Sequence, residues 1–105
     1  MPTWYHYTDK EGYDLIRSQP TWKFHASQPP GEHPLGAYFT TKPPETRGLA
    51  RSLRLPRRKL AYVFAFSGAD DLTPLPGGRG EFVSYFPGDY DVPKERQLFT
   101  QEIGQ

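Results

Sequence analysis

The chain contains no cysteine, which excludes disulfide bonds and cysteine-ligated metal centres. It has no apolar run near the roughly 20 residues that a membrane-spanning helix needs, so we expect no membrane association. No basic segment followed by an apolar one opens the chain, and the sequence therefore predicts no signal peptide. The 13 basic and 12 acidic residues nearly cancel, so the net charge of +1 gives no overall attraction to nucleic acid.

Phosphate-binding and metal-binding motifs are also missing. The sequence has no P-loop and no G-x-G-x-x-G, and no serine lies in a nucleophile-elbow sequence. His25 and His33 lack the spacing to other histidines or carboxylates that a zinc site requires. We therefore predict no metal site.

Aromatic residues and loop-forming residues are abundant instead. Aromatics make up 15% of the 105 residues, which favours a folded core over disorder. The 12 prolines and 10 glycines favour long loops between short strands. A chain of this length builds one hydrophobic core, so residues 1–105 are expected to form a single domain.

The apolar pattern predicts about six short strands, one or two helices and an α+β fold with a mostly antiparallel sheet. A helix over 10–19 is capped by Thr8 or Asp9 and ends at Pro20, with Tyr13, Ile16 and Leu15 as its apolar stripe. A second short helix is predicted within 45–53 and loops over 27–35 and 67–80. Strands are predicted over 3–7, 21–26, 36–40, 60–66, 81–86 and 96–103, with 60–66 central and 96–103 at an edge.

Three motifs within these elements carry residues capable of chemistry. The first reads His-Tyr-Thr-Asp at 6–9, the second Gly-Ala-Tyr-Phe-Thr at 36–40, and the third places Glu81 before Phe-Val. In this order and spacing they resemble the diphtheria-toxin-like ADP-ribosyltransferases, and most closely their small toxin-domain branch named for a His-Tyr-Asp signature. The resemblance covers essentially the whole chain.

This resemblance implies a fold, a reaction and a set of partners. The fold would be the split two-sheet antiparallel ADP-ribosyltransferase fold, with NAD⁺ as substrate between the sheets and no metal. The reaction would cleave the nicotinamide–ribose bond through an oxocarbenium-like transition state, as an ADP-ribosyltransferase or NAD⁺ glycohydrolase. The acceptor would be protein, nucleic acid or water. A toxin or effector domain would act in a target cytoplasm after delivery and would have an immunity protein.

Roles for individual residues also follow from the resemblance. His6 would bond ribose hydroxyls, the backbone of Tyr7 would hold the nicotinamide amide, and Tyr38 would stack on the nicotinamide ring. Glu81 would stabilise the developing positive charge. The catalytic set is then His6, Tyr38 and Glu81, and the NAD⁺-binding set is His6, Tyr7, Thr8, Gly36, Tyr38 and Thr40.

The position of the acid stays open. Glu81 is preferred as the catalytic acid because a side chain on a strand is held in a more fixed orientation than one on a loop. Asp89 and Asp91, in the following turn, are the alternatives. Relatives that modify arginine carry an acid or glutamine two residues before the glutamate. Arg79 stands there in this chain, which leaves the acceptor open.

Structural and binding roles compete with this hypothesis. His6 could be a histidine whose hydrogen bonds are made within the fold. Tyr38 could be a ring packed in the core, and Glu81 could be a solvated surface charge. The six basic residues of 47–59 form either a solvated surface or a landing site for the NAD⁺ pyrophosphate or an anionic acceptor. Two further hypotheses are a nucleic-acid-binding module that uses this segment with exposed tyrosines, and an inactive relative that binds a partner or ADP-ribose.

Overall fold

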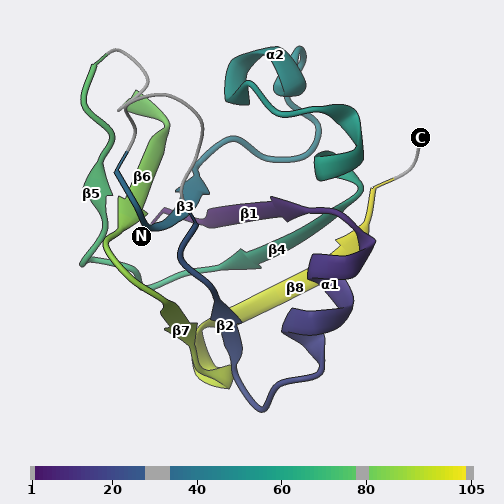
Figure 1. The fold of residues 1–105 in the computed structure, drawn as a ribbon, viewed down its shortest axis with the longest axis vertical. Coiled ribbons are helices and arrows are strands. Elements are labelled where there is room, and N and C mark those ends of the chain that lie inside the picture. Colours follow the sequence, from purple (N-terminus) through teal and green to yellow (C-terminus); the bar gives the residue numbers. More distant parts are fainter. Residues whose placement is uncertain (1, 28–33, 78–80, 104–105) are drawn as a thin grey trace.

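The computed structural model describes residues 2–27, 34–77 and 81–103, which form two antiparallel sheets together with two helices (Figure 1). The larger sheet has six strands in the order β5-β6-β3-β1-β4-β8, and the smaller sheet pairs β2 with β7. The strands are β1 (Trp4–Thr8), β2 (Trp22–Phe24), β3 (Ala37–Thr40), β4 (Tyr62–Phe66), β5 (Thr73–Pro74), β6 (Val83–Phe86), β7 (Tyr90–Val92) and β8 (Gln97–Glu102). The helices are α1 (Lys10–Arg17) and α2 (Leu49–Leu53), with 3-10 turns η1 (Arg57–Leu60) and η3 (Lys94–Arg96).

Strand β1 lies inside the large sheet between β3 and β4. It pairs with β4 along its whole length, from Trp4–Phe66 to Thr8–Tyr62. Residues 63–66 of β4 are fully buried, because both faces of the sheet are covered there. The N-terminal motif is therefore held in a central strand rather than in a surface loop.

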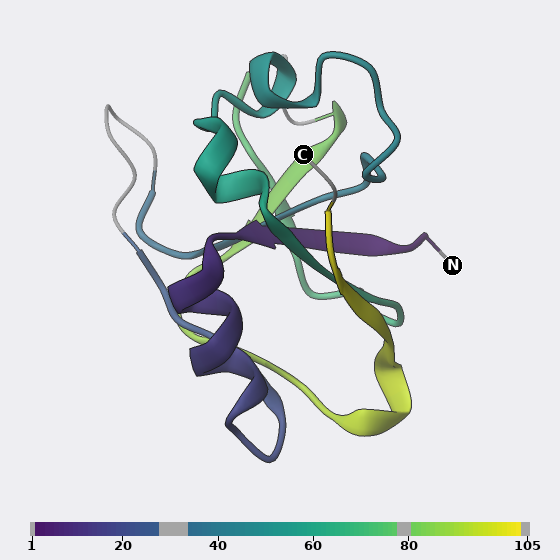
Figure 2. The ribbon, with the colours of Figure 1, turned by 90° about the vertical axis from the view of Figure 1, so that its right-hand side faces the viewer.

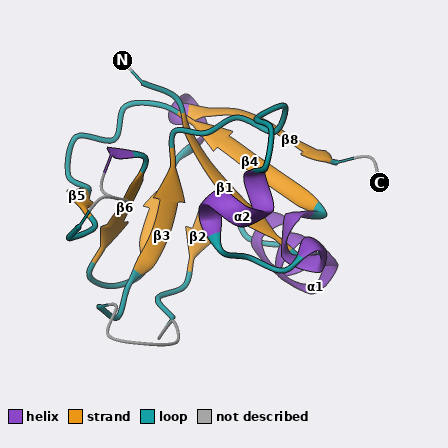
Figure 3. Cartoon of the chain, turned by 90° about the horizontal axis from the view of Figure 1, so that it is seen from above, coloured by secondary structure: helices purple, strands orange, loops and turns teal. Residues whose placement is uncertain are grey.

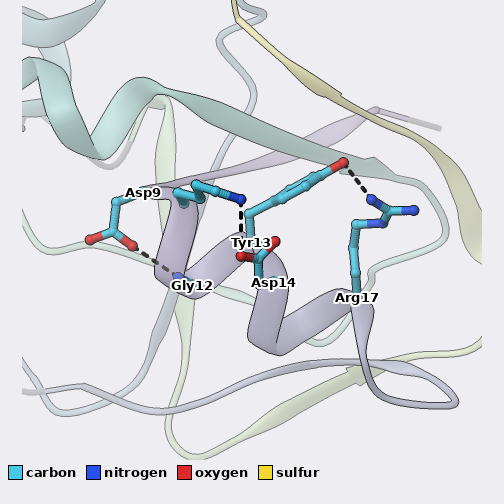
Figure 4. A network of polar contacts seen from close by, with 6 residues as sticks. Asp9, Gly12, Tyr13, Asp14 and Arg17 are labelled. Atoms are coloured by element: carbon cyan, nitrogen blue, oxygen red, sulfur yellow. Dashed lines mark hydrogen bonds and ion pairs between the residues drawn. The ribbon is translucent and has the colours of Figure 1, made fainter.

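Helix α1 follows β1 directly, and side chains of the motif determine where it begins (Figure 4). The Asp9 carboxylate accepts a 2.9 Å hydrogen bond from the backbone N–H of Gly12, which satisfies a donor of the first turn. A Cβ at Gly12 would clash with the Thr8 hydroxyl oxygen, so glycine lets the helix and the strand pack closely without displacing that side chain. The motif thus has a clear structural function.

The large sheet buries apolar side chains on both faces, and Figure 2 shows α1 and α2 on opposite sides of β1. One face, which we call the β2/β7 face, is covered by β2, β7 and α1; the other, the α2 face, is covered by α2 and the turn after it. The core of the β2/β7 face contains Ile16, Trp22, Phe24, Ala37, Phe39, Phe64, Phe66, Tyr90 and Val92. The core of the α2 face contains Tyr7, Leu49, Leu53, Val63, Leu75 and Val83.

The predicted α+β class with antiparallel sheets is confirmed, together with the α1 helix, its Asp9 cap and the edge position of β8. Several details of the prediction are wrong. Leu15 is 53% exposed rather than part of the apolar stripe. The second helix begins only at Leu49, because Gly48 adopts a left-handed conformation. Strands β5 and β7 were not predicted, and residues 28–33 and 78–80 of the two predicted loops lie outside the described residues.

Helix α2 ends in an unusual way for its sequence. The N–H of Leu55 donates to the carbonyl of Ala50 and that of Arg54 to Arg51, which is the hydrogen-bond pattern of a Schellman cap. This cap requires a left-handed residue, and Arg54 has φ 56° and ψ 42°. Glycine is usual at such a position because a side chain adds steric cost.

We expect Arg54→Gly to raise the free energy of unfolding by about 0.5–1 kcal/mol, because glycine adopts the left-handed conformation without that cost. Urea unfolding followed by circular dichroism measures the change. Arg51→Gly is the matched control, since it places glycine inside α2 and should lower stability by about 1 kcal/mol. Equal effects of the two substitutions would contradict this account.

Candidate functional site

The imidazole of His6 lies between two aromatic rings on the β2/β7 face. Its centroid is 4.6 Å from that of Phe24 and 5.7 Å from that of Phe39. Its Nδ1 is 3.0 Å from the backbone carbonyl oxygen of Tyr38. A carbonyl oxygen only accepts, so Nδ1 carries the proton and donates, and Nε2 is the acceptor nitrogen of the ring.

The surroundings of His6 keep the ring neutral. Burial lowers the pKa of His6 to about 4, and the positive charge of Lys59 acts in the same direction. The hydrogen bond to the Tyr38 carbonyl opposes these effects without reversing them. At neutral pH, His6 is therefore an uncharged ring with one fixed donor and one acceptor.

Strands β1 and β3 part at the position of His6. Among the described residues they share one Cα register pair, Tyr5–Thr40, whereas β1 and β4 share five. Beyond that pair, the His6 imidazole supplies the donor for the Tyr38 carbonyl. We call this part of the β1–β3 edge, from His6 and Phe39 onward, the β1–β3 split.

The ring of Tyr38 lies on the opposite face of the sheet from His6. Its neighbours Ala37 and Phe39 belong to the β2/β7 core, while Tyr38 packs against the core of the α2 face. The ring stacks on Tyr85 at a centroid distance of 5.7 Å, and its hydroxyl donates to the carbonyl of Pro34. His6 thus contacts the backbone of Tyr38, while the two side chains point to different faces.

Tyr38 belongs to a group of tyrosines on the α2 face. Tyr5, Tyr38 and Tyr85 are partly buried there, and Figure 3 shows α2 above β1 and β4, to one side of β3 and β6. Burial, together with the negative charge of Glu45, raises the pKa of Tyr5. We call these three rings with Glu45 the tyrosine surface.

Gly36 and Thr40 hold β3 against β6. A Cβ at Gly36 would lie 2.5 Å from the backbone oxygen of Phe86, so only glycine permits this approach of the two strands. The Thr40 hydroxyl donates to the carbonyl of Phe82 and accepts from the N–H of Lys42. These contacts explain the glycine and threonine of the second motif in structural terms.

Glu81 lies in a different part of the fold from the two candidate aspartates, both of which contact the segment around β2. Glu81 is exposed and precedes β6, which begins at Val83, so the expectation of a strand-borne acid is wrong. Asp89 accepts a 2.7 Å hydrogen bond from the N–H of Ala26, which lowers its pKa, and it lies 3.4 Å from His25. Asp91 accepts from the Thr21 hydroxyl at 3.3 Å. Both aspartates connect the β7 region to the segment around β2.

Sequence reasoning missed two members of the site. It did not place Tyr85 beside Tyr38, because that contact depends on the register of β3 against β6. It also passed over Glu45, whose charge acts on Tyr5 and Tyr7. The alternation of Val83 and Tyr85 indicates a shared face, but not the partner strand.

Comparisons with protein-family models, curated proteins and solved structures find no match to this chain. In the described residues, no cluster of three or more histidines, aspartates and glutamates could hold a metal ion. No helix in the same part of the chain is long and apolar enough to cross a membrane.

Gly36→Ala is expected to lower the free energy of unfolding by about 1–3 kcal/mol, because the added Cβ meets a backbone carbonyl that cannot rotate away. Leu35→Ala is the neighbouring control, since that side chain is 55% exposed, and it should change stability by less than about 0.5 kcal/mol. Thermal unfolding of both variants tests the prediction, and a Gly36→Ala protein as stable as wild type would refute it.

The neutral state of His6 predicts a pH dependence of stability. Between the unfolded pKa of about 6.5 and the folded pKa of about 4, the unfolded chain binds a proton that the folded chain does not. The stability that comes from keeping His6 neutral is complete above a pH of about 6.5. It is lost as the pH falls towards about 4. The slope is at most about 1.4 kcal/mol per pH unit, and partial exposure of His6 reduces it.

Urea unfolding across this pH range measures the effect. His6→Gln should remove this part of the pH dependence, whereas His25→Gln, which removes an exposed histidine, should retain it. A wild-type slope that persists in His6→Gln would show that another group is responsible.

Proposed function

We propose that this chain cleaves the nicotinamide–ribose bond of NAD⁺ and passes ADP-ribose to an acceptor or to water, within an ADP-ribosyltransferase-like fold. The observation that carries the proposal is the neutral imidazole of His6 at the β1–β3 split, fixed through Nδ1 by the Tyr38 carbonyl. Its Nε2 is an acceptor suited to a ribose hydroxyl. The order of the motifs along the chain supports the same reaction.

The charge of the reaction suits a neutral histidine. The nicotinamide ring of NAD⁺ is cationic, and positive charge moves to the ribose as the bond breaks. A protonated imidazole beside the ribose would oppose that charge, whereas a ring whose pKa lies near 4 does not. A carboxylate near the ribose would stabilise the charge further and carry the larger share of catalysis.

The tyrosine surface supplies the second part of the proposed site. Tyr38 and Tyr85 offer stacked, partly buried rings against which a flat heteroaromatic ring can pack. Because Tyr38 and His6 lie on opposite faces, a ligand that contacts both side chains must reach them past the edge where β1 and β3 part. The long, flexible dinucleotide is suited to such a path.

Release of free nicotinamide from NAD⁺ by the purified chain, with and without cell extract as a source of acceptors, tests this function. Wild type should release nicotinamide, and His6→Gln should lower kcat/KM by about tenfold through loss of one hydrogen bond. Tyr38→Ala should act mainly by raising KM, because stacking contributes to binding of the ground state.

The same assay identifies the acid. Glu81→Gln, Asp89→Asn, Asp91→Asn and Glu45→Gln are compared, and the variant that lacks the catalytic carboxylate should lose about 10²–10³-fold in kcat. Circular dichroism of each variant controls for unfolding, above all for the two aspartates that contact the β2 region. Absence of nicotinamide release in every condition, or a wild-type rate in His6→Gln, would refute the proposed function.

A further inference from the structure

A shallow depression of about 270 Å³ lies beside α2 and η1, and neither His6 nor a ring of the tyrosine surface is among its described lining residues. Its lining is mostly apolar, and Arg57 is the charged member. The apolar members are Pro44, Leu49, Ala50, Leu60 and Ile103. The depression has room for one or two aliphatic side chains of a partner.

Basic residues lie in or next to the segments that line this depression: Arg57 is in the lining, and Arg47 and Arg51 adjoin Gly48 and Ala50 in sequence. Arg47, Arg51, Arg54 and Arg57 are exposed. Of the ion pairs found in the described part of the chain, those that involve residues 47–59 join Arg58 and Lys59 to Asp9. The four arginines therefore present positive charge that these ion pairs do not neutralise. Glu45 is the acidic residue of the preceding loop, and its charge acts on Tyr5 and Tyr7.

The backbone of Arg54 is a second, independent observation. This residue occupies the left-handed position that ends α2, where glycine would be favoured. The chain thus carries a long cationic side chain at the end of α2, next to Leu55, whose N–H bonds the carbonyl of the lining residue Ala50, at a cost to local stability. Such departures from local preference concentrate where a residue serves binding rather than folding.

We propose that this surface docks an acidic segment of a partner protein, with an aliphatic side chain in the depression and its carboxylates on the arginines. Guanidinium groups suit carboxylates because they offer paired donors in a planar fork. Among the described residues, the lining contains no aromatic ring on which a base could stack, and it is mostly apolar, so a peptide fits this surface better than a nucleic acid. The inference is independent of the proposed NAD⁺ chemistry.

Selection from a phage-displayed library of random peptides, about 12 residues long, tests the proposal on the intact chain. Peptides enriched on wild type should combine several acidic residues with at least one large aliphatic residue. The triple variant Arg51→Glu, Arg54→Glu, Arg57→Glu should not enrich them, and circular dichroism establishes that it is folded. The best peptide is then synthesised with a fluorescent label for anisotropy measurements.

Single substitutions separate the two parts of the surface. Ala50→Met fills the depression without changing charge and should weaken peptide binding by about fivefold or more. Arg54→Gly should weaken it by about two- to fivefold although it stabilises the fold. Lys94→Glu, a charge reversal at an exposed position of η3, is the control for charge reversal in the triple variant and should leave affinity within about twofold.

Three results would overturn the proposal. The first is a set of enriched peptides with no excess of acidic residues. The second is equal enrichment on the charge-reversed triple variant. The third is a single-stranded DNA of about 20 nucleotides that binds as tightly as the best peptide with the same loss in the arginine variants, which would assign the surface to nucleic acid instead.

Discussion

The six-stranded sheet carries apolar side chains on both faces, so its four inner strands β6, β3, β1 and β4 must serve two cores with alternating residues. Strand β4 meets this constraint with a continuous run of buried residues, and β1 meets it with aromatic residues on both sides. The same alternation places consecutive residues of the first motif on opposite faces of the sheet. His6 joins the rings of the β2/β7 core, while Tyr7 joins the core of the α2 face.

Local signals in the sequence were sufficient for much of the fold. The Asp9 cap, the alternation of Trp22 and Phe24, and the apolar run of β4 predicted their elements from short-range physics. Strand β7 was missed because its three residues stand between a glycine turn and Pro93, and pairing with β2 together with burial of Tyr90 and Val92 stabilises them. The second helix was predicted too long because nothing in a single sequence shows that Gly48 adopts φ 66°.

The candidate site was less predictable than the fold. Residue identities pointed to His6 and Tyr38, but the faces on which they lie depend on strand parity and on the register between β1 and β3. The contact between Tyr38 and Tyr85 depends likewise on pairing of strands some 45 positions apart in sequence. Glu81 was expected on β6. That strand begins two positions later than predicted, at Val83, which leaves Glu81 in an exposed turn.

The central place of β1 also bears on how the chain folds. Tyr5 is paired with Thr40 on one side and with Ala65 on the other, so the first strand finds its partners only when distant segments arrive. Contacts of such sequence separation slow folding, because long loops must close before any stabilisation is gained. During synthesis, the first strand remains without its β4 neighbour until residues 62–66, more than 50 positions further along the chain, have left the ribosome. Until then, its aromatic residues are exposed to chaperones and to other nascent chains.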